Sequence, residues 1–330
     1  MATDAGDLDQ GIKLTQWGRL EEAEALLRRA VAADPDRPEP RRALAMNLLT
    51  QGRYEAAWPL YEARLEMTSL SDGVPRNLPY PRWRGENLAG RRIVLFPEQG
   101  WGDQIQFVRF LPALARLADH VTLLAPPTLE RLFRHNFPQV DVLAAQGPVE
   151  FPDPDYWSTL AELPGRLGTT LETIPQPPYL AAPGQWVGAP DGLKIGLMTK
   201  GNPNYLLDQW RSLPDALGER LLNGLPGRVF SLLPSATGAR DFADTAAVIA
   251  ALDLVVSVDT AAAHLAGAMN KPCFLLVQGV GADWRWMRNR DDSPWYPAHR
   301  LYRGAPDTSW DAAIDRLIAD ARVFLSAAAD

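Results

Sequence analysis

Residues 98–103 read Glu-Gln-Gly-Trp-Gly-Asp and end on a carboxylate, Asp103, at the predicted start of a helix. Glycines such as Gly100 and Gly102 let a backbone turn close to a ligand. A carboxylate beside such a turn can act as a general base if it reaches the proton of a hydroxyl. Aspartate at a helix start also stabilises the helix by about 1 kcal/mol without any chemistry. The spacing alone leaves both hypotheses open, a catalytic base and a helix cap.

A second segment that could do chemistry is the junction at Asp259 and Thr260, where an apolar strand runs into a helix. The free backbone N–H groups and the dipole of a helix start bind phosphate. Small residues from Ala261 onward would permit a close approach. The alternative is that Asp259 or Thr260 only caps the helix. For His264, one turn further on, packing is the simpler interpretation, and a role as ligand stays open.

A polar loop between a strand and a helix comprises residues 198–203 and 208–214 and carries Lys200, Asn202, Arg211 and Ser212. Cationic donors at such a place could stabilise the charge that develops on a diphosphate leaving group. Solvation of a surface loop is the alternative.

Aromatic residues crowd the segments 283–288 and 293–297, which read Asp-Trp-Arg-Trp-Met-Arg and Ser-Pro-Trp-Tyr-Pro. Such side chains can stack on sugars or bases, but in loops they more often lock irregular chain onto its own domain. Packing is therefore predicted for most of them.

Other chemistries lack their motifs. The chain has no Cys/His spacing for zinc, no Walker phosphate loop and no Gly-x-Ser-x-Gly turn. The pair Gly279 and Gly281 is too short for a dinucleotide fingerprint. We expect metal-free chemistry without a resident cofactor.

Alternating strands and helices must position these residues. Strands are predicted at 92–97, 120–125, 140–144 and 156–160, with helices at 103–117 and 129–135. A second series has strands at 194–200, 228–234, 254–259 and 273–277, with helices at 216–225, 245–252 and 261–269. This alternation predicts an α/β fold with two doubly wound parallel lobes in tandem, and places ligands in the cleft between them. A helix at 311–326 is expected to cap or bridge the lobes.

An internal repeat precedes the lobes. An offset of about 34 residues places Gly18 on Gly52 and Ala23 on Ala57, a period typical of tetratricopeptide helix pairs. The units are predicted at 4–37 and 38–71, although Arg64 stands where a small residue is usual and Pro59 interrupts the last helix. Two units are too few for a free solenoid. They serve either as a prop for the lobes, which we favour, or as a groove for a protein partner.

The predicted organisation is therefore repeats at 1–71, a linker at 72–91, a first lobe at 92–185 and a second lobe at 186–330. Composition agrees with a folded globular protein, since the chain of 330 residues is 46% hydrophobic and 22% charged. A net charge of −7 argues against bulk binding to nucleic acid or anionic membranes. The single Cys273 and the absence of a signal-like N-terminus lead us to expect a cytoplasmic protein without integral membrane association.

These segments together resemble the bacterial glycosyltransferases that bear tetratricopeptide repeats. The part after the repeats is similar to the ADP-heptose lipopolysaccharide heptosyltransferases of glycosyltransferase family 9, which have the GT-B architecture. The matching stretches follow one another in order: 98–103 with Gln106, Phe107, Arg109 and Pro112; 241–247; 252–261 with His264; Asp283–Trp286; and 292–297.

The resemblance implies an inverting, metal-independent transfer of a sugar from a nucleotide donor, with Asp103 as the base. It places the diphosphate at Asp259, Thr260 and Ala261. The donor set implied is Lys200, Asn202, Arg211, Ser212 and His264 with these three residues. The acceptor side would be lined by Glu98, Gln99, Gly100, Gly102, Gln106 and Arg109. The acceptor would be a hydroxyl of a protein, reached through the repeats, or of a cell-envelope glycan.

The chain departs from that family at three places. Residues 199–203 read Thr-Lys-Gly-Asn-Pro where relatives have Trp-Ala-Gly-Asn-Pro, and residues 208–212 lack one arginine of the usual Asp-Arg-x-Arg-Ser. The connection at 234–240 is also shorter than the relatives' segment, which helps to hold the nucleoside. A catalytically degenerate adaptor that binds partners through its repeats and cleft is therefore the second hypothesis.

Overall fold

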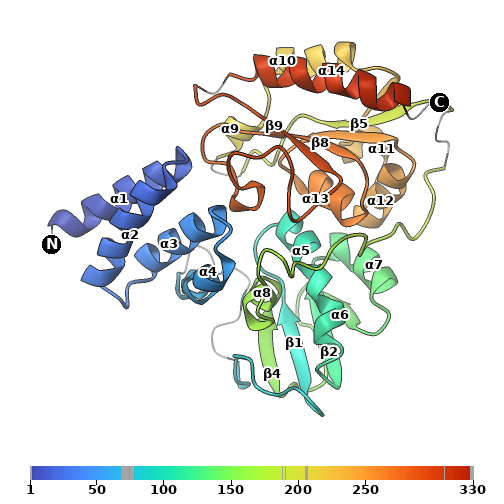
Figure 1. Ribbon diagram of the computed structural model, residues 1–330. Helices are drawn as coiled ribbons and strands as arrows, with labels where there is room; N and C mark the ends of the chain where they lie inside the picture. Colours follow the sequence, from blue (N-terminus) through green and yellow to red (C-terminus); the bar gives the residue numbers. More distant parts are fainter. Residues whose placement is uncertain are drawn as a thin grey trace.

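The protein is described by a computed structural model that covers residues 2–67, 74, 78–187, 189, 191–204, 207–307 and 309–327, with side chains from residue 6 onward. Helical repeats lie beside two α/β lobes, and the second lobe sits above the first in Figure 1. Within the described residues, none of the helices is both long and apolar enough to cross a membrane.

The repeats form two antiparallel helix pairs, which confirms the tetratricopeptide prediction. Their helices are α1 (Ala2–Gln16), α2 (Leu20–Ala33), α3 (Pro38–Thr50) and α4 (Tyr54–Tyr61). Gly18 and Gly52, with φ of 77° and 76°, make the turn inside each pair. The small residues Ala23 and Ala57 are fully buried where helices cross. After Pro59 the chain tightens into a 3₁₀ turn, η1 (Glu62–Glu66).

The first lobe is a parallel sheet in the order β3-β2-β1-β4. Its strands are β1 (Arg92–Phe96), β2 (His120–Ala125), β3 (Asp141–Ala144) and β4 (Tyr156–Thr159), all at predicted positions. Its helices and 3₁₀ turns are α5 (Trp101–Phe107), η2 (Val108–Phe110), α6 (Leu111–Leu114), α7 (Pro127–Asn136), η3 (Leu160–Glu162) and α8 (Leu163–Arg166). The expected continuous helix at 103–117 is thus divided, because Pro112 has no amide N–H to donate to Val108.

The second lobe is a parallel sheet in the order β6-β5-β7-β8-β9. Its strands are β5 (Lys194–Met198), β6 (Arg228–Ser231), β7 (Leu254–Val258), β8 (Cys273–Val277) and β9 (His299–Arg303). Its helices and 3₁₀ turn are α9 (Asp208–Arg211), α10 (Asp215–Gly224), α11 (Pro234–Thr237), α12 (Phe242–Ala250), α13 (Ala261–Ala268), η4 (Trp284–Trp286) and α14 (Asp311–Ala327). The sequence did not predict β9, because its polar His-Arg-Leu-Tyr-Arg run lacks the apolar character of the other strands.

Helix α14 caps the second lobe and does not bridge the two lobes, so the bridging expectation was wrong. Its apolar stripe, including Ile314, Leu317 and Ala321, is buried in a cluster with the second sheet. In Figure 1 it lies at the top, on the side away from the first lobe. The buried stripe of this helix therefore faces its own lobe and not the other one.

The predicted linker at 72–91 lies partly outside the described residues, which omit 72, 73 and 75–77. Its described end runs along β4, where the Trp83 amide donates to the Trp157 carbonyl at 2.8 Å. This end of the linker therefore extends the first lobe.

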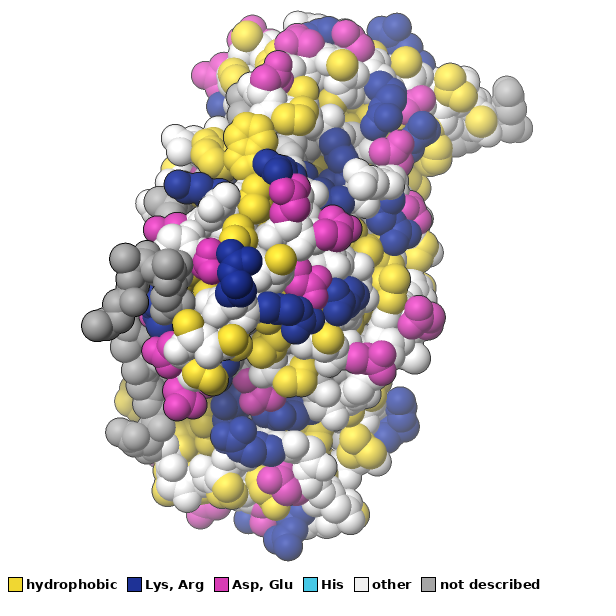
Figure 2. All heavy atoms as spheres, turned by 60° about the vertical axis from the view of Figure 1, so that its left-hand side comes forward, with side chains coloured by type: hydrophobic (Ala, Val, Ile, Leu, Met, Phe, Trp, Pro, Cys, Tyr) yellow, Lys and Arg dark blue, Asp and Glu magenta, His cyan; other side chains and the backbone are white. Residues whose placement is uncertain are grey.

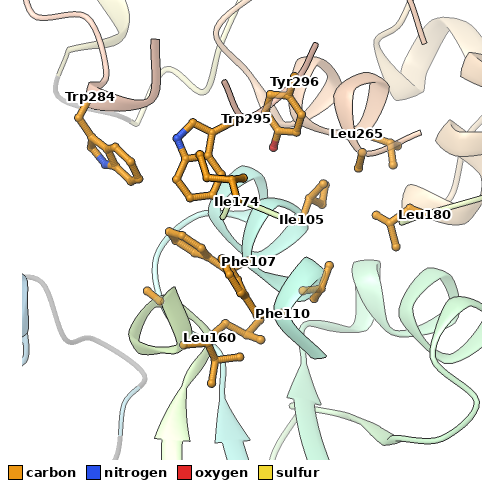
Figure 3. Close-up of a cluster of buried hydrophobic side chains, with 14 of the residues drawn as sticks. Ile105, Phe107, Phe110, Leu160, Ile174, Leu180, Leu265, Trp284, Trp295 and Tyr296 are labelled. Atoms are coloured by element: carbon orange, nitrogen blue, oxygen red, sulfur yellow. The ribbon is translucent and has the colours of Figure 1, made fainter. Parts of the chain in front are cut away.

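One buried apolar cluster runs from the repeats through the first lobe to the inner side of the second. Figure 3 shows Ile105 and Phe107 of α5 below Trp295 and Tyr296 of the second lobe, with Trp284 to one side. Helix α5 also packs against α13. Because the lobes share this core, the relative position of the helix starts that border the cleft is fixed by packing.

Candidate active site

A cleft of about 970 Å³ separates the lobes where α5 and α13 begin. It lies beyond the carboxyl ends of the strands, the usual ligand position of open parallel sheets. The predicted residues that line it are Gln99, Gly100, Gly102, Asp103, Lys200, Asn202, Arg211, Asp259, Thr260, Ala261 and His264. The structure therefore brings together the two motifs that the sequence places about 150 residues apart.

Asp103 borders the cleft and also caps its own helix. Its Oδ2 accepts a hydrogen bond from the Gly100 amide at 3.0 Å, and Oδ1 accepts one from Arg285 Nη2 at 2.5 Å. The side chain keeps 23% of its exposure. Burial raises the pKa of Asp103, and the Arg285 charge opposes that rise. The structure thus joins the two hypotheses, because one carboxylate caps the helix and faces the cleft.

Arg285, in η4 of the second lobe, is a site residue that the sequence analysis missed. Its side chain is 3% exposed and donates to both oxygens of Asp283 at 3.0 Å. Its Nε donates to Gln106 Oε1. Burial alone would lower the pKa of Arg285, but Asp283 and Asp103 outweigh burial and raise it. The sequence feature that could have predicted this role is an arginine within a tryptophan-rich, and therefore buried, segment. A buried arginine requires an acidic partner.

The start of α13 has the features of an anion site. Thr260 is its N-cap residue, with extended backbone, and Ala261 begins the helix. Arg211 Nη1 donates to the Asp259 carbonyl at 2.9 Å, and Arg211 Nε pairs with Asp208 Oδ1 at 2.8 Å. A guanidinium and the positive end of a helix dipole therefore border the same part of the cleft.

Asp259 lies at this junction with a side chain 12% exposed. Burial, followed by the neighbouring Asp283 charge, raises its pKa to about 6. The His264 Nε2 atom lies 3.7 Å from Asp259 Oδ1. Asp259 is thus a carboxyl whose charge changes near neutral pH, next to the predicted phosphate position.

His264 joins the two lobes. Its Nδ1 hydrogen bonds with the Tyr296 hydroxyl at 2.9 Å, and burial lowers its pKa well below the usual value, so the imidazole is neutral. A Cβ added to Gly102 would lie 2.6 Å from His264 Cδ2. The ring therefore packs directly on the start of α5 while it also lines the cleft.

Glu98, Gln106 and Arg109 do not line the cleft, which corrects their expected place on the acceptor side. Glu98 is buried in a bidentate ion pair with Arg64 of the repeats, at 2.5 and 2.9 Å. This pair explains the departure from the repeat pattern at Arg64. The Gln99 amide turns the same way and donates to the Tyr61 hydroxyl at 2.8 Å, although the residue still borders the cleft.

Arg109 is buried where the lobes join, so it serves their packing. It donates to the carbonyls of Pro175 and Trp295 at 3.1 and 3.0 Å and to the Tyr179 hydroxyl at 2.9 Å. These donations satisfy a guanidinium that has no access to solvent.

Ser212 also lies away from the cleft, contrary to expectation. Its hydroxyl accepts from the Gly201 amide and donates to Asp208 Oδ2, each at 2.7 Å. Lys200 lines the cleft, but its Nζ is engaged by the Leu213 carbonyl at 2.6 Å and by Asp215 at 2.7 Å. Ser212 therefore shapes the loop that carries Arg211.

The aromatic segments serve packing, as predicted, but they pack against the repeats and not only onto their own domain. Trp284 and Trp295 lie 5.9 and 5.8 Å from the Tyr54 ring, and Trp295 Nε1 donates to the Tyr54 hydroxyl at 2.8 Å. Trp58 Nε1 donates to the Thr169 carbonyl at 2.8 Å. The repeats are therefore a prop for both lobes, which was the favoured interpretation.

The short connection at 234–240 forms α11 and borders the cleft through Leu233, Pro234, Ala239 and Arg240. Beyond it, Asp241 pairs across the lobes with Arg131 at 2.6 Å. Trp101, 50% exposed, meets Phe242 edge to face at 5.5 Å. Contacts between the lobes thus form this wall of the cleft. In the described residues no group of three or more His, Cys, Asp or Glu side chains could hold a metal ion.

The structure thus has a repeat segment and two Rossmann-like lobes, with a cleft between the lobes that is bordered by the start of α13 and by Arg211. Models of two known families match stretches of this chain. A tetratricopeptide-repeat model matches residues 14–66, and the model of glycosyltransferase family 9 (heptosyltransferase) matches residues 216–276. The stretch that resembles glycosyltransferase family 9 contains the start of α13.

Among curated proteins, the chain is similar to Protein FlbA of Caulobacter vibrioides, with 28% identity over 86% of this chain and 54% of FlbA. The chain thus spans about half the length of the relative it matches. Among solved structures, the glycosyl transferase family 9 protein of Veillonella parvula has 13% identity and a TM-score of 0.46, covering 66% of this chain and 87% of that one. The iron-containing dodecameric glycosyltransferase TibC of enterotoxigenic E. coli has 12% identity and a TM-score of 0.44, covering 61% and 60%. Similarities at this level carry no functional argument.

Proposed function

We propose that this protein is a glycosyltransferase that moves a sugar from a nucleotide donor, held mainly by the second lobe, to a hydroxyl presented from the first. The observation that carries the proposal is one cleft in which Asp103 and the start of α13 line the same space. The family 9 match at 216–276 supports the donor side.

In this proposal Asp103 takes the proton from the acceptor hydroxyl as the new glycosidic bond forms. The carboxylate is held in place by the Gly100 amide and by Arg285. A base positioned in this way accelerates proton transfer by typically 10²–10⁴-fold. One displacement by the acceptor oxygen would invert the configuration at the sugar carbon.

The leaving diphosphate would be stabilised by the first N–H groups of α13 together with Arg211. Fixed positive charge is most effective where negative charge develops in the transition state. The arrangement supplies that charge from protein groups, so we propose a transfer that needs no metal and no resident cofactor.

For the acceptor, we propose a hydroxyl of a protein or of a cell-envelope glycan, and for the sugar a hexose or heptose. The repeats support a protein partner, but one side of them is already covered by Trp284 and Trp295. A partner would therefore have to contact the outer helices.

A binding protein without catalysis is the second candidate. It is favoured by the short connection at 234–240 and by the ion pair that already engages Asp103. Such a protein would bind a partner or a nucleotide in the cleft without turnover.

The deciding experiment is a thermal-shift panel of UDP-, ADP-, GDP- and CMP-sugars, followed by a transfer assay with the donor that binds. Saturation with a true donor should raise the melting temperature by several degrees. Asp103→Asn keeps the size of the side chain and should reduce transfer at least 10²-fold while donor binding persists.

The matched control is Asp119→Asn, an exposed carboxylate of the same lobe, which should leave transfer unchanged. Unchanged transfer in Asp103→Asn would remove Asp103 from the mechanism. Binding without turnover of any sugar nucleotide in the wild type would favour the second candidate.

A further inference from the structure

Arg285 reaches Asp103 from the opposite lobe. The two residues are 182 positions apart in the chain, and their side chains meet across the border of the cleft at 2.5 Å. Asp103 belongs to α5 of the first lobe, whereas Arg285 belongs to η4, which follows β8 of the second. The environment of the carboxylate is therefore completed only when the lobes are docked.

Arg285 itself is held from several sides. Its guanidinium lies over the Trp284 ring at 4.5 Å and the Phe107 ring at 5.2 Å. Asp283 binds one end, and Gln106 Oε1 accepts from Nε. Gln106 is on the same helix as Asp103, so this contact sets the guanidinium relative to the carboxylate. Gln106 does not line the cleft as expected, but it holds Arg285 in place.

We propose that Arg285 is a positioning residue, which fixes the orientation of the Asp103 carboxylate and keeps it ionised by a charge supplied from the other lobe. The proposal rests on the function proposed above, in which Asp103 is the base. It assigns to the tryptophan-rich segment a role beyond packing. It also makes the reactivity of the first-lobe base depend on the docked second lobe.

The surrounding charges leave Arg285 as the main cation for this carboxylate. Groups that act on Asp103 or lie against its helix start are Arg285, Asp283, Glu98 with its partner Arg64, Tyr61, and the neutral His264. Asp283 and Glu98 are acids and disfavour ionisation of Asp103, as burial does. Removal of the Arg285 charge should therefore raise the pKa of Asp103 further.

The test compares Arg285→Gln and Arg285→Lys with the wild type, and uses Arg290→Gln as the matched control. Arg290 lies five residues further along the chain, pairs with Asp292 and does not line the cleft. The side-chain carboxyl of Asp103 is titrated by carbon-13 NMR and assigned by its absence in Asp103→Asn. The acid limb of the pH dependence of transfer is measured in parallel.

In Arg285→Gln we expect the Asp103 titration and the acid limb to move up by at least one pH unit, and kcat to fall more than the donor KM rises. Lysine keeps the positive charge, but its single ammonium group cannot bind Asp103, Asp283 and Gln106 at the same time. Arg285→Lys should therefore give a smaller shift, and it stands in if Arg285→Gln fails to fold. Arg290→Gln should leave both measurements unchanged.

An unmoved Asp103 titration in folded Arg285→Gln would overturn the proposal, even if stability fell, and so would an unchanged titration together with an unchanged kcat in Arg285→Lys. The NMR titration needs no turnover. Absence of transfer in the wild type would therefore contradict the proposed function, while the coupling between Arg285 and Asp103 would still be measured.

Discussion

At the scale of single residues, two of the carboxyls that line the cleft have different surroundings. Asp103 is held by the Gly100 amide and Arg285, whereas Asp259 lies beside His264 and near Asp283. An ionised carboxylate beside the proposed diphosphate site repels an anionic ligand, so with a pKa of about 6 this repulsion weakens only as pH falls through 6. The proposed base and the proposed anion site therefore have different electrostatic environments.

The pKa of about 6 for Asp259 predicts a pH dependence of stability. The folded pKa lies above the unfolded value of about 3.9, so the group favours the folded state at low pH and this contribution is lost as pH rises through 6. Asp259→Asn should therefore become more stable relative to the wild type, by about 1 kcal/mol, between pH 5 and pH 8. Urea unfolding at both pH values measures this.

The exposed Asp119→Asn variant is the control, and its difference from the wild type should stay constant. A difference for Asp259→Asn that does not change with pH would mean that Asp259 is ionised throughout this range.

At the scale of elements, the packing of α5 on α13 depends on the lack of a side chain at Gly102. The ring of His264 is fixed by its bond to Tyr296, so it cannot move away from an added methyl group. Gly102→Ala should cost about 1–3 kcal/mol of unfolding free energy, because a crowded contact forces the helices apart. Urea denaturation measures the cost.

Gly218→Ala, in helix α10, is the matched control because its added Cβ finds its nearest neighbour, Thr199, at 3.6 Å. That variant should not be destabilised. If the contact with His264 is the cause, the double variant Gly102→Ala with His264→Ala should lose less unfolding free energy than the two single variants lose in sum.

At the scale of the whole molecule, the repeats and the lobes share one interior. The Arg64–Glu98 ion pair is almost completely buried, with side-chain exposures of 3% and 0%. The hydrogen bonds of Trp58 and Trp295 cross the same boundary. Two repeats cannot fold as a free solenoid, so this shared interior supplies the packing that further repeats would otherwise give.

Arg64→Met should therefore destabilise the protein by about 3–5 kcal/mol, because it leaves Glu98 buried without a counter-charge. The double variant Arg64→Met with Glu98→Gln should recover most of that loss. Equilibrium unfolding followed by tryptophan fluorescence measures both. Arg19→Met, which breaks a pair with side chains 59% and 58% exposed, should leave the free energy of unfolding nearly unchanged. Equal costs for the buried and the exposed pair would contradict the shared-interior account.

The overall charge of the molecule does not indicate a binding surface for an anionic ligand. Figure 2 shows Lys and Arg side chains interspersed with Asp and Glu side chains over the face it presents. With a net charge of −7, the molecule as a whole does not attract anions. The proposed capture of a diphosphate therefore depends on the local arrangement at Arg211 and α13.

The sequence by itself determined the repeats, both parallel sheets and the placement of Asp103 and Asp259 at helix starts. These features follow from local patterns, in which apolar runs, glycines and polar junctions lie within one strand–helix unit. Pro112, which divides the helix after Asp103, was visible in the sequence, but its effect was not predicted. The edge strand β9 was not predicted, because its polar residues interrupt the apolar run that indicates a buried strand.

Only the tertiary structure decided what the charged side chains do. Glu98 pairs with Arg64 and does not line the cleft, and Arg109 hydrogen bonds where the two lobes meet. Arg285, in a segment for which only packing was predicted, pairs with Asp103. Each of these pairings joins residues that are 34 to 186 positions apart. The partner of a buried charge is set by which elements pack together, and no local pattern in the sequence specifies that.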